Sequence, residues 1–161
     1  PPRSTLSSSS AASDVYKRQS HEGASIAEDF KIRLINLQTL IDKINKVDPE
    51  RIKKMENKLK SSLEELQIEI DQNRFEQELI YYIEKLDITE EKVRLSNHIE
   101  YFTNTMENPS SSGKKLGFIA QEMGREINTI GSKANHAGLQ KIVIQMKDEL
   151  EKIKEQLLNV L

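Results

Sequence analysis

The strongest constraint on the fold is a repeat of apolar residues near the C-terminal end of the chain. Between Leu139 and Val160 the apolar side chains recur at alternating steps of four and three residues, with no Gly or Pro to interrupt them. This spacing lines up one face of a helix and is typical of a heptad seam. The seam can pack against another helix of the same chain or against a second subunit, and the sequence leaves both open. Its members are Leu139, Val143, Met146, Leu150, Ile153, Leu157 and Val160.

Steps of three and four also run through the rest of the chain, and no segment shows the alternation of a strand. The pattern Asp48-Pro49-Glu50 is expected to end one helix and begin the next, because Asp is a good N-cap and Pro fits the first helical position. Asp87-Ile88-Thr89-Glu90 predicts a capping box. We therefore expect an all-α fold with a long projecting hairpin, made by the first two helices, and a C-terminal heptad-patterned helix. The expected helices before it span about 24–44, 50–70, 74–86, 90–108 and 114–130, the last ended by Gly131.

Residues 1–19 do not read as natural protein sequence. Back-translation of Ser9–Gln19 gives the transposase adapter used in sequencing libraries, and Pro1–Thr5 gives the flow-cell adapter that precedes it, in the same frame. We interpret 1–19 as translated adapter, exclude it from functional reasoning, and expect natural sequence before Ser20 to be missing. The remainder is expected to divide into a linker with the hairpin, 20–72, and a helical domain, 73–161.

The charge balance restricts the partners that the chain can bind. The formal net charge is −2, so an anionic partner such as RNA needs a local cluster of basic residues. There is no Cys, which excludes a disulfide scaffold, a thiolate metal site and a Cys nucleophile, and fits a reducing compartment. No apolar run approaches the length of a membrane span.

The segment Lys114–Lys133 carries the most informative polar pattern. On a helix, Glu122 and Glu126 lie one turn apart, where two carboxylates can share a hard divalent cation such as Mg²⁺ or Mn²⁺. Arg125 and Lys133 share that face and can hold a phosphate. Ordinary surface ion pairs between Glu and Arg explain the same spacing, and the residues alone favour that reading.

Two weaker candidates lie elsewhere. Arg94 and His98 are one turn apart, and a His near carboxylates can act as a general base or a ligand, although a lone His is more often a surface or capping residue. Lys115 follows Gly113 at an expected helix start and can bind phosphate there, but the spacing is not that of a P-loop.

Three segments resemble a known family. They are NRFEQELIYYIEKLDITEEKVRLSNHIEYF, GKKLGFIAQEMGREINTIGSKAN and IVIQMKDELEKIKEQLLNV, and they resemble the C-terminal half of the YicC/YloC-like endoribonuclease family. The most specific motif is F-I-x-Q-E-M-x-R-E-I-N-T-x-G-S-K, and the resemblance runs from about Glu22 to the end of the chain. It implies a bacterial cytoplasmic enzyme that cleaves RNA with a divalent metal, with an N-terminal α/β half and a ring-like homo-oligomer, a hexamer.

The resemblance also assigns roles. We predict that Glu122 and Glu126 position the metal ion, that Arg125 and Lys133 hold the scissile phosphate, and that His98 and Arg94 assist acid–base chemistry or RNA binding. Lys115, Asn128 and Thr129 are predicted RNA contacts. The family's polar motif falls on Glu122, Arg125, Glu126, Asn128, Thr129, Ser132 and Lys133, and a second set falls on Glu78, Asp87, Glu91, Arg94 and His98.

The chain departs from the family pattern at a few positions. Gly117 stands where many members have Asp, and His136 and Gly138 stand where an acidic residue and a larger residue are usual. A missing Asp weakens the metal assignment if it is a ligand. The competing function is a non-catalytic helical domain for oligomerisation or RNA binding, and a third is RNA binding without cleavage, which needs no divalent ion.

Overall fold

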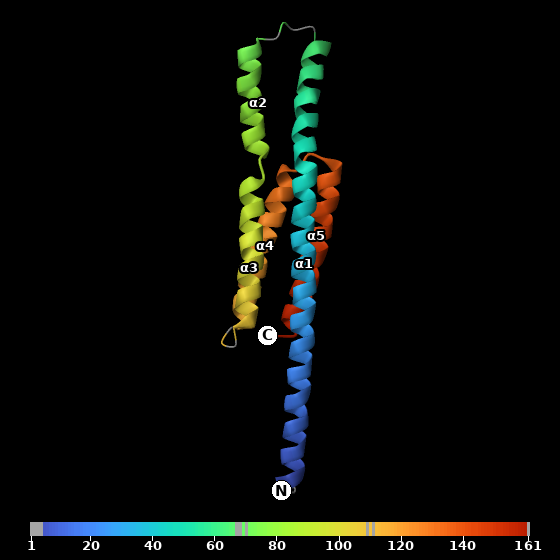
Figure 1. The fold of residues 1–161 in the computed structure, drawn as a ribbon, viewed down its shortest axis with the longest axis vertical. Helices are drawn as coiled ribbons and strands as arrows, with labels where there is room; N and C mark the ends of the chain where they lie inside the picture. The colour runs from blue at the N-terminus through green and yellow to red at the C-terminus, as the bar shows by residue number, and fades with distance from the viewer. Residues whose placement is uncertain (1–4, 67–68, 70, 109, 111, 161) are drawn as a thin grey trace.

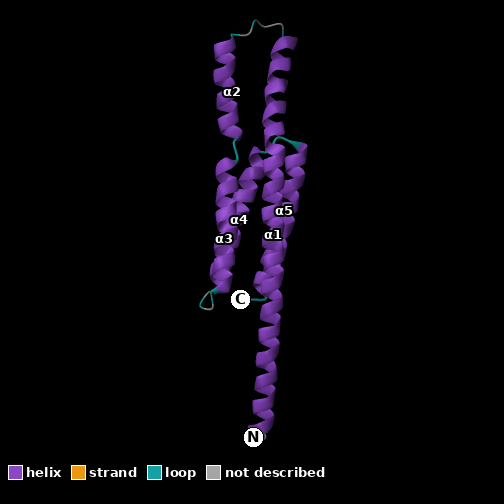
Figure 2. Ribbon diagram, viewed as in Figure 1, coloured by secondary structure: helices purple, strands orange, loops and turns teal. Residues whose placement is uncertain are grey.

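The computed structural model describes residues 5–66, 69, 71–108, 110 and 112–160, with side chains from Gly23 onward. Within these ranges it contains helices and no strand, which confirms the all-α prediction (Figure 2). The adapter interpretation of residues 1–19 stays a prediction, because Pro1–Ser4 and the side chains before Gly23 lie outside what is described. The helices are α1 (Thr5–Glu65), α2 (Gln72–Leu86), α3 (Thr89–Glu107), α4 (Gly113–Lys133) and α5 (Ala137–Leu158).

The middle of α1 forms a four-helix bundle with α3, α4 and α5 (Figure 1). Contacts join α3 to α4, α4 to α5, α5 to α1 and α1 to α3, so the four helices close a ring around one core. Phe30 and Phe102 meet edge to face at its α1–α3 side, with ring centroids 5.3 Å apart. Fully buried members from each helix include Leu37, Ile44, Leu95, Phe102, Met123, Ile127, Leu139 and Met146.

The heptad seam of α5 packs inside this bundle. Every predicted member from Leu139 to Leu157 is buried, and α5 contacts α1 and α4 of the same chain. Val160 is exposed. The sequence left two packing partners possible for the seam, and in the structure the seam packs against helices of its own chain.

The predicted helix break at Asp48-Pro49-Glu50 is wrong, because α1 continues through Pro49. Pro49 cannot donate to the carbonyl of Asn45, four residues earlier, which destabilises the helix at this point. The residues around it are nonetheless fixed by tertiary contacts, since Asp48 and Arg51 are both buried and bonded to other helices. Packing has overridden the local stop signal.

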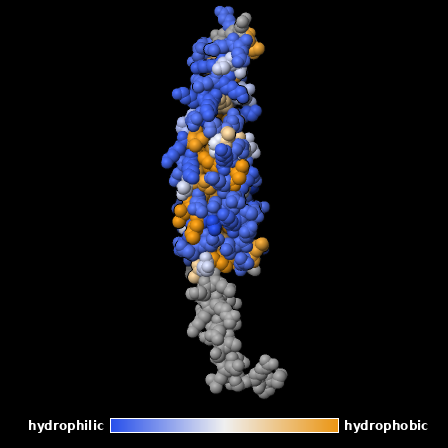
Figure 3. Space-filling view, turned by 90° about the vertical axis from the view of Figure 1, so that its right-hand side faces the viewer, coloured by the Kyte–Doolittle hydropathy of each residue, from blue (hydrophilic) through white to orange (hydrophobic). Residues whose placement is uncertain are grey.

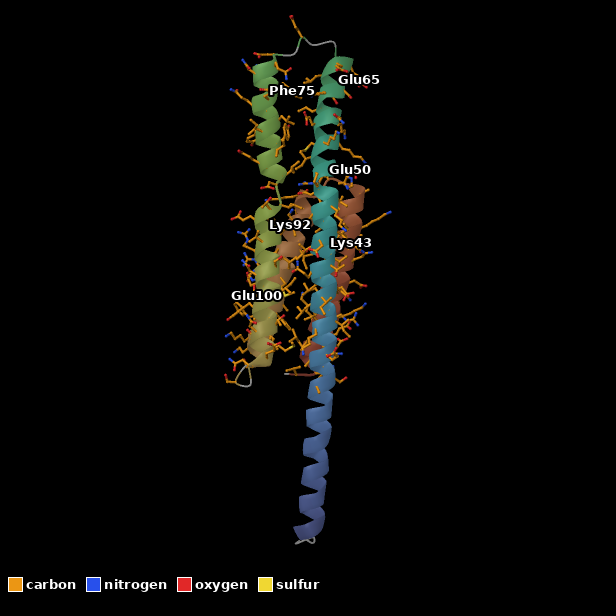
Figure 4. The ribbon with its side chains drawn as sticks, viewed as in Figure 1. Lys43, Glu50, Glu65, Phe75, Lys92 and Glu100 are labelled. Carbon is orange, nitrogen blue, oxygen red and sulfur yellow. The ribbon has the colours of Figure 1, made fainter. Side chains whose placement is uncertain are left out.

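A helical hairpin projects beyond one end of the bundle, as predicted, but its arms differ from the predicted ones. They are residues 51–65 of α1 and the whole of α2, rather than the two segments on either side of Pro49 (Figure 1). Asp71 begins α2 by accepting hydrogen bonds from the backbone of Asn73 and Arg74. Phe75 is the only buried residue of α2, and it faces α1, with Lys60 Nζ 5.8 Å from its ring centroid (Figure 4).

Two helix boundaries in the bundle differ from expectation. Gly131 does not end α4, which continues to Lys133; a Cβ at Gly131 would lie 3.2 Å from Val143, so the glycine permits close approach to α5. The capping box at Asp87 forms only in part. The Asp87 carboxylate accepts from the backbone and hydroxyl of Thr89, which lowers the pKa of Asp87, but no hydrogen bond from Glu90 completes the box.

Hydrophilic residues cover most of the face seen in Figure 3, with apolar side chains showing mainly over the bundle. Among the residues that the structure describes, no helix combines the length and apolar character that crossing a bilayer requires.

Candidate functional site

Three of the predicted site residues, Arg94, Glu126 and Lys133, meet along a polar seam between α3 and α4. This α3–α4 seam is defined by these three residues together with Glu90 and Glu91. Two ion pairs cross between the helices. Arg94 Nε lies 3.1 Å from Glu126 Oε1, and Lys133 Nζ lies 2.8 Å from Glu91 Oε1. The helices are antiparallel, so these pairs fix their register.

Arg94 is the centre of the seam. Its Nη1 lies 3.1 Å from Glu90 and its Nη2 lies 3.8 Å from Glu91, in addition to the contact with Glu126. The hydrogen bond to Glu126 raises the pKa of Arg94 above its ordinary value, so the guanidinium stays cationic. The Arg94 side chain remains 45% exposed while that of Glu126 is 11% exposed. The guanidinium is therefore charged, fixed in orientation by three carboxylates and still partly open to solvent.

Both the side chain and the backbone of Lys133 are hydrogen-bonded to other elements. Its ammonium donates to Glu91 and to the carbonyl of Asp87 at 3.0 Å, while its own carbonyl accepts from Arg51 Nη1 at 3.2 Å. These bonds tie the last residue of α4 to the α2–α3 junction and to α1. Lys133 is thus fixed in position by three elements.

Arg51 is the residue that the sequence interpretation missed. Its side chain is 1% exposed, and it donates to Asp48 at 2.8 Å, to the carbonyl of Leu86 at 2.7 Å and to the carbonyl of Lys133. Lys92 Nζ binds the second Asp48 oxygen at 3.5 Å and Asn45 Oδ1 at 2.9 Å. A signal was present, because Asp48 and Arg51 continue the buried stripe of Ile41 and Ile44 at steps of four and three.

Glu91 belongs to the second set of family positions and lies deepest in the seam. It is 3% exposed, and its Oε2 has no hydrogen-bond partner among the residues described. Buried carboxylate oxygens are usually bonded, so this atom has unused capacity directly beside Lys133 and Arg94.

The other predicted residues are dispersed around this seam. Arg125 is 72% exposed and pairs with Glu122 at 3.5 Å, and Thr129 donates back to the carbonyl of Arg125. Asn128 is exposed to solvent. His98 is half-buried on the same side of α3 as Arg94, where the antiparallel register places it level with Glu122.

Two residues lie away from the seam. Lys115 sits over the ring of Tyr101 at 5.2 Å, and it is separated from Lys133 by about 27 Å along α4 at ~1.5 Å per residue. Glu78 lines a groove of about 370 Å³ between the hairpin arms, with Leu59, Leu63 and Phe75.

The fit of a metal ion to these residues is incomplete. Within the described part of the chain, no three His, Asp or Glu side chains converge as a protein-held metal site requires. Glu126 is engaged by Arg94 and Glu122 by Arg125. The carboxylates have the right hard oxygens for Mg²⁺ or Mn²⁺, but as arranged they are partners of arginines.

Comparison with known proteins gives the same assignment as the motif. Residues 44–161 match the family model described as endoribonuclease YicC-like, C-terminal. The chain is 40% identical over 145 residues to a probable endoribonuclease YicC of Clostridioides difficile (strain 630), covering 88% of this chain and 50% of that protein.

A second relative, the probable endoribonuclease YicC of Haemophilus influenzae (strain ATCC 51907 / DSM 11121 / KW20 / Rd), is 29% identical over 147 residues, covering 91% of this chain and 51% of that protein. The chain therefore spans about half the length of the curated relatives that it matches. With most of its residues inside the family model, this chain belongs to the endoribonuclease YicC-like family, within the C-terminal region of that family.

Proposed function

We propose that this chain is the C-terminal helical part of an endoribonuclease, and that its α3–α4 seam holds the RNA phosphate at which cleavage occurs. The observation that carries the proposal is Arg94, an exposed guanidinium fixed by Glu90 and Glu126 on the face of a bundle whose family has an endoribonuclease description. Fixed cationic donors stabilise the charge that develops on a phosphorane without reorganising during the reaction.

Each residue of the seam has a role in this proposal. Arg94 and Lys133 bind the non-bridging phosphate oxygens. Arg125, an exposed side chain that pairs with Glu122, adds a third cation. Glu126 and Glu91 act through them by setting their positions. His98 transfers the proton of the attacking or leaving oxygen.

The charge of this region supports the predicted need for a divalent cation. Carboxylates at Glu90, Glu91, Glu122 and Glu126 outnumber the cations at Arg94, Arg125 and Lys133, so a phosphodiester entering alone meets a net negative surface. Dependence on Mn²⁺ or Mg²⁺ therefore stays our prediction, with Glu122 and Glu126 as protein ligands and the remainder supplied by water and substrate. A cytoplasmic location and a hexameric assembly stay predictions as well.

The test uses a full-length chimaera in which the N-terminal half of the Clostridioides difficile relative precedes residues 20–161 of this chain. Arg94→Ala is expected to lower kcat/KM for a labelled single-stranded RNA by roughly 10²-fold, in line with the loss of one charge-stabilising donor. Glu126→Gln is also expected to lower kcat/KM, because it releases Arg94 and removes one of the two predicted metal ligands. EDTA is expected to abolish cleavage, and Mn²⁺ or Mg²⁺ to restore it.

Lys141→Ala is the matched control, since Lys141 is an exposed cation on α5, outside the seam. Full activity of a folded Arg94→Ala chimaera contradicts the role of the seam. Activity that survives EDTA contradicts the metal prediction while leaving the seam intact.

The alternative function is a non-catalytic domain for oligomerisation or RNA binding. The observation that favours it is the apolar hairpin groove, together with the exposed Ile80 and Tyr81 on α2. It predicts a chimaera that binds RNA and assembles, but whose cleavage is absent or is unchanged by every seam variant.

A further inference from the structure

We propose that Phe118 of α4 and Tyr101 of α3 bind unpaired bases of a single-stranded RNA by stacking, next to the phosphate held at Arg94. The inference deepens the proposed function and rests on it for the identity of the ligand as RNA. It makes the protein selective for single-stranded over double-stranded RNA, because the faces of a base inside a duplex are already covered by its stacked neighbours.

Phe118 and Tyr101 are the two exposed aromatic residues in the described part of the four-helix bundle. Phe118 is 67% exposed and Tyr101 is 48% exposed. The other aromatic residues of the bundle, Phe30 and Phe102, pack against each other in the core. Two rings on neighbouring helices therefore remain open to solvent.

The register of α3 against α4 brings these two residues to the same level. Arg94 pairs with Glu126 across the antiparallel helices. Tyr101 lies seven residues beyond Arg94 on α3, and Phe118 lies eight residues before Glu126 on α4, so both are about two turns from this ion pair. Lys115 supports this register, since its Nζ lies 5.2 Å from the ring centroid of Tyr101. The two rings thus flank the continuation of the α3–α4 seam.

The packing of α4 does not account for Phe118. The buried stripe of this helix runs through Ile119 and Met123. Phe118 lies instead on the outward face, at steps of seven residues with Arg125 and Ser132, which are exposed as well. A flat apolar ring in a row of polar side chains gives this face a group that can stack on a base.

The charges around the two rings are complementary to an RNA backbone. The carboxylates of α4, Glu122 and Glu126, are both paired with arginines. Four cations lie on the same helix, and they are Lys114, Lys115, Arg125 and Lys133. Aromatic rings among cations are the combination by which proteins bind single strands, since the rings stack on the bases and the cations bind the phosphates.

A second protein chain fits this surface less well than RNA does. Phe118 is the only large apolar residue exposed along α4, the whole of which the structure describes. The other exposed residues on the outward face of α4 are charged or carry an amide or a hydroxyl, and they are Lys114, Gln121, Arg125, Asn128 and Ser132. The core of a stable protein–protein interface is more apolar than this and is depleted of charged residues. The composition is closer to that of a nucleic-acid interface.

One short strand can reach both the rings and the phosphate site. Phe118 and Glu126, the partner of Arg94, are about 12 Å apart along α4 at ~1.5 Å per residue. A strand stacked at ~3.4 Å per nucleotide covers this span in about three to four nucleotides. A base that stacks on Phe118 therefore belongs to a nucleotide at that separation from the phosphate at Arg94.

The test is binding of a labelled, single-stranded 2′-O-methyl RNA of about 12 nucleotides to the full-length chimaera in Mg²⁺. This RNA lacks the 2′-hydroxyl that can attack the phosphate, so its binding is measured apart from that reaction. Phe118→Ala and Tyr101→Leu are each expected to weaken binding by about 5-fold or more, the loss of one stacked base, while Phe118→Tyr retains it. The same strand annealed to its complement is expected to bind the native chimaera about 5-fold or more weakly than the single strand.

A strand of abasic residues with the same phosphates separates stacking from charge. It is expected to bind the native chimaera about 5-fold or more weakly than the strand with bases, and to bind Phe118→Ala and the native chimaera equally. A merely structural role of Phe118 would weaken the binding of both strands alike.

Ile144→Ala is the matched control, because Ile144 is an apolar residue of α5 that is 65% exposed and lies outside the seam. Equal affinity of Phe118→Ala and Ile144→Ala for the single strand overturns the inference. An equal loss for the abasic strand overturns it too, as does a native chimaera that binds the duplex as tightly as the single strand or binds neither. If Arg94→Ala still lowers cleavage in those cases, the proposed function stands without the stacking. Base-dependent binding that Phe118→Ala abolishes, in a chimaera that cleaves no RNA, has the reverse meaning.

Discussion

His136 and Gly138 illustrate how two neighbouring residues constrain each other. His136 Nδ1 accepts from the backbone of Leu139 at 3.2 Å, so the imidazole is the N-cap of α5. A Cβ added at Gly138 would lie 2.9 Å from His136 Cε1 and 3.2 Å from Nδ1. From the sequence, an acidic and a larger residue are expected at these positions, and a larger residue at 138 does not fit beside His136 as it is placed here. The ring that caps the helix occupies the space of a side chain at 138.

We predict that the two positions are energetically coupled. In the native background, Gly138→Ala should lower the free energy of unfolding by about 1 kcal/mol, because the ring must leave its capping position. In a His136→Ser background, which keeps a cap, the same change should be neutral or stabilising by up to about 0.5–1 kcal/mol, as expected for Gly→Ala in a helix. Urea unfolding of the four proteins measures the coupling. Additive effects within about 0.3 kcal/mol contradict it.

At the scale of elements, the most consequential feature is the passage of α1 through Pro49. The local sequence carries a sound stop-and-start signal, and only the rest of the fold overrides it. Arg51 donates to Asp48 and to the last carbonyls of α2 and α4. One guanidinium on α1 therefore connects the base of the hairpin to the C-terminal ends of two other helices. Carbonyls at helix ends lack intrahelical donors and need such partners.

Replacing Arg51 should therefore destabilise the protein strongly. Arg51→Met preserves volume but leaves Asp48 buried with only Lys92 and leaves two carbonyls without their donor, so we expect a loss of about 3–5 kcal/mol. Arg51→Lys should lose less, because it keeps the charge without the fork of donors. Arg125→Met is the control, with an expected change within about 0.5 kcal/mol at an exposed position. Thermal unfolding of the three variants measures these losses of stability. Equal stability of Arg51→Met and Arg125→Met excludes the role given to Arg51.

The same element shows what the sequence can and cannot predict. Periodicity predicted the helices of the bundle, because buried residues such as Leu37, Met123 and Leu150 recur at the steps of three and four that mark one face of a helix. It did not predict that Asp48 and Arg51 would occupy buried stripe positions, since charged residues normally mark the solvent side. It placed Glu126 and Lys133 on one polar face of α4, but their pairing with Arg94 and Glu91 depends on the register of α3 against α4. That register is a property of the packed bundle.

At the scale of the molecule, stability is distributed unevenly between bundle and hairpin. Every buried apolar side chain among the described residues belongs to one cluster in the bundle, except Phe75. The hairpin arms enclose a groove of about 370 Å³ rather than a filled core, and Ile80, Tyr81 and Tyr82 of α2 are exposed. Since burial of apolar area is the main stabilising contribution, the hairpin depends on the bundle, whereas the bundle does not depend on the hairpin.

Hydrogen exchange should distinguish the stability of the hairpin from that of the bundle. We predict that amides of residues 76–84 exchange through local opening, at a free energy about 2 kcal/mol or more below that of α5 amides near Met146. Phe75→Ala should remove the remaining protection of the hairpin without changing that of α5, whereas Phe102→Ala, in the core, should lower the protection of α5. Equal protection throughout the native chain contradicts the division into two parts. Hairpin protection that rises with protein concentration would mean that a second copy covers the groove, and the hairpin would then gain from assembly the apolar burial that it lacks within one chain.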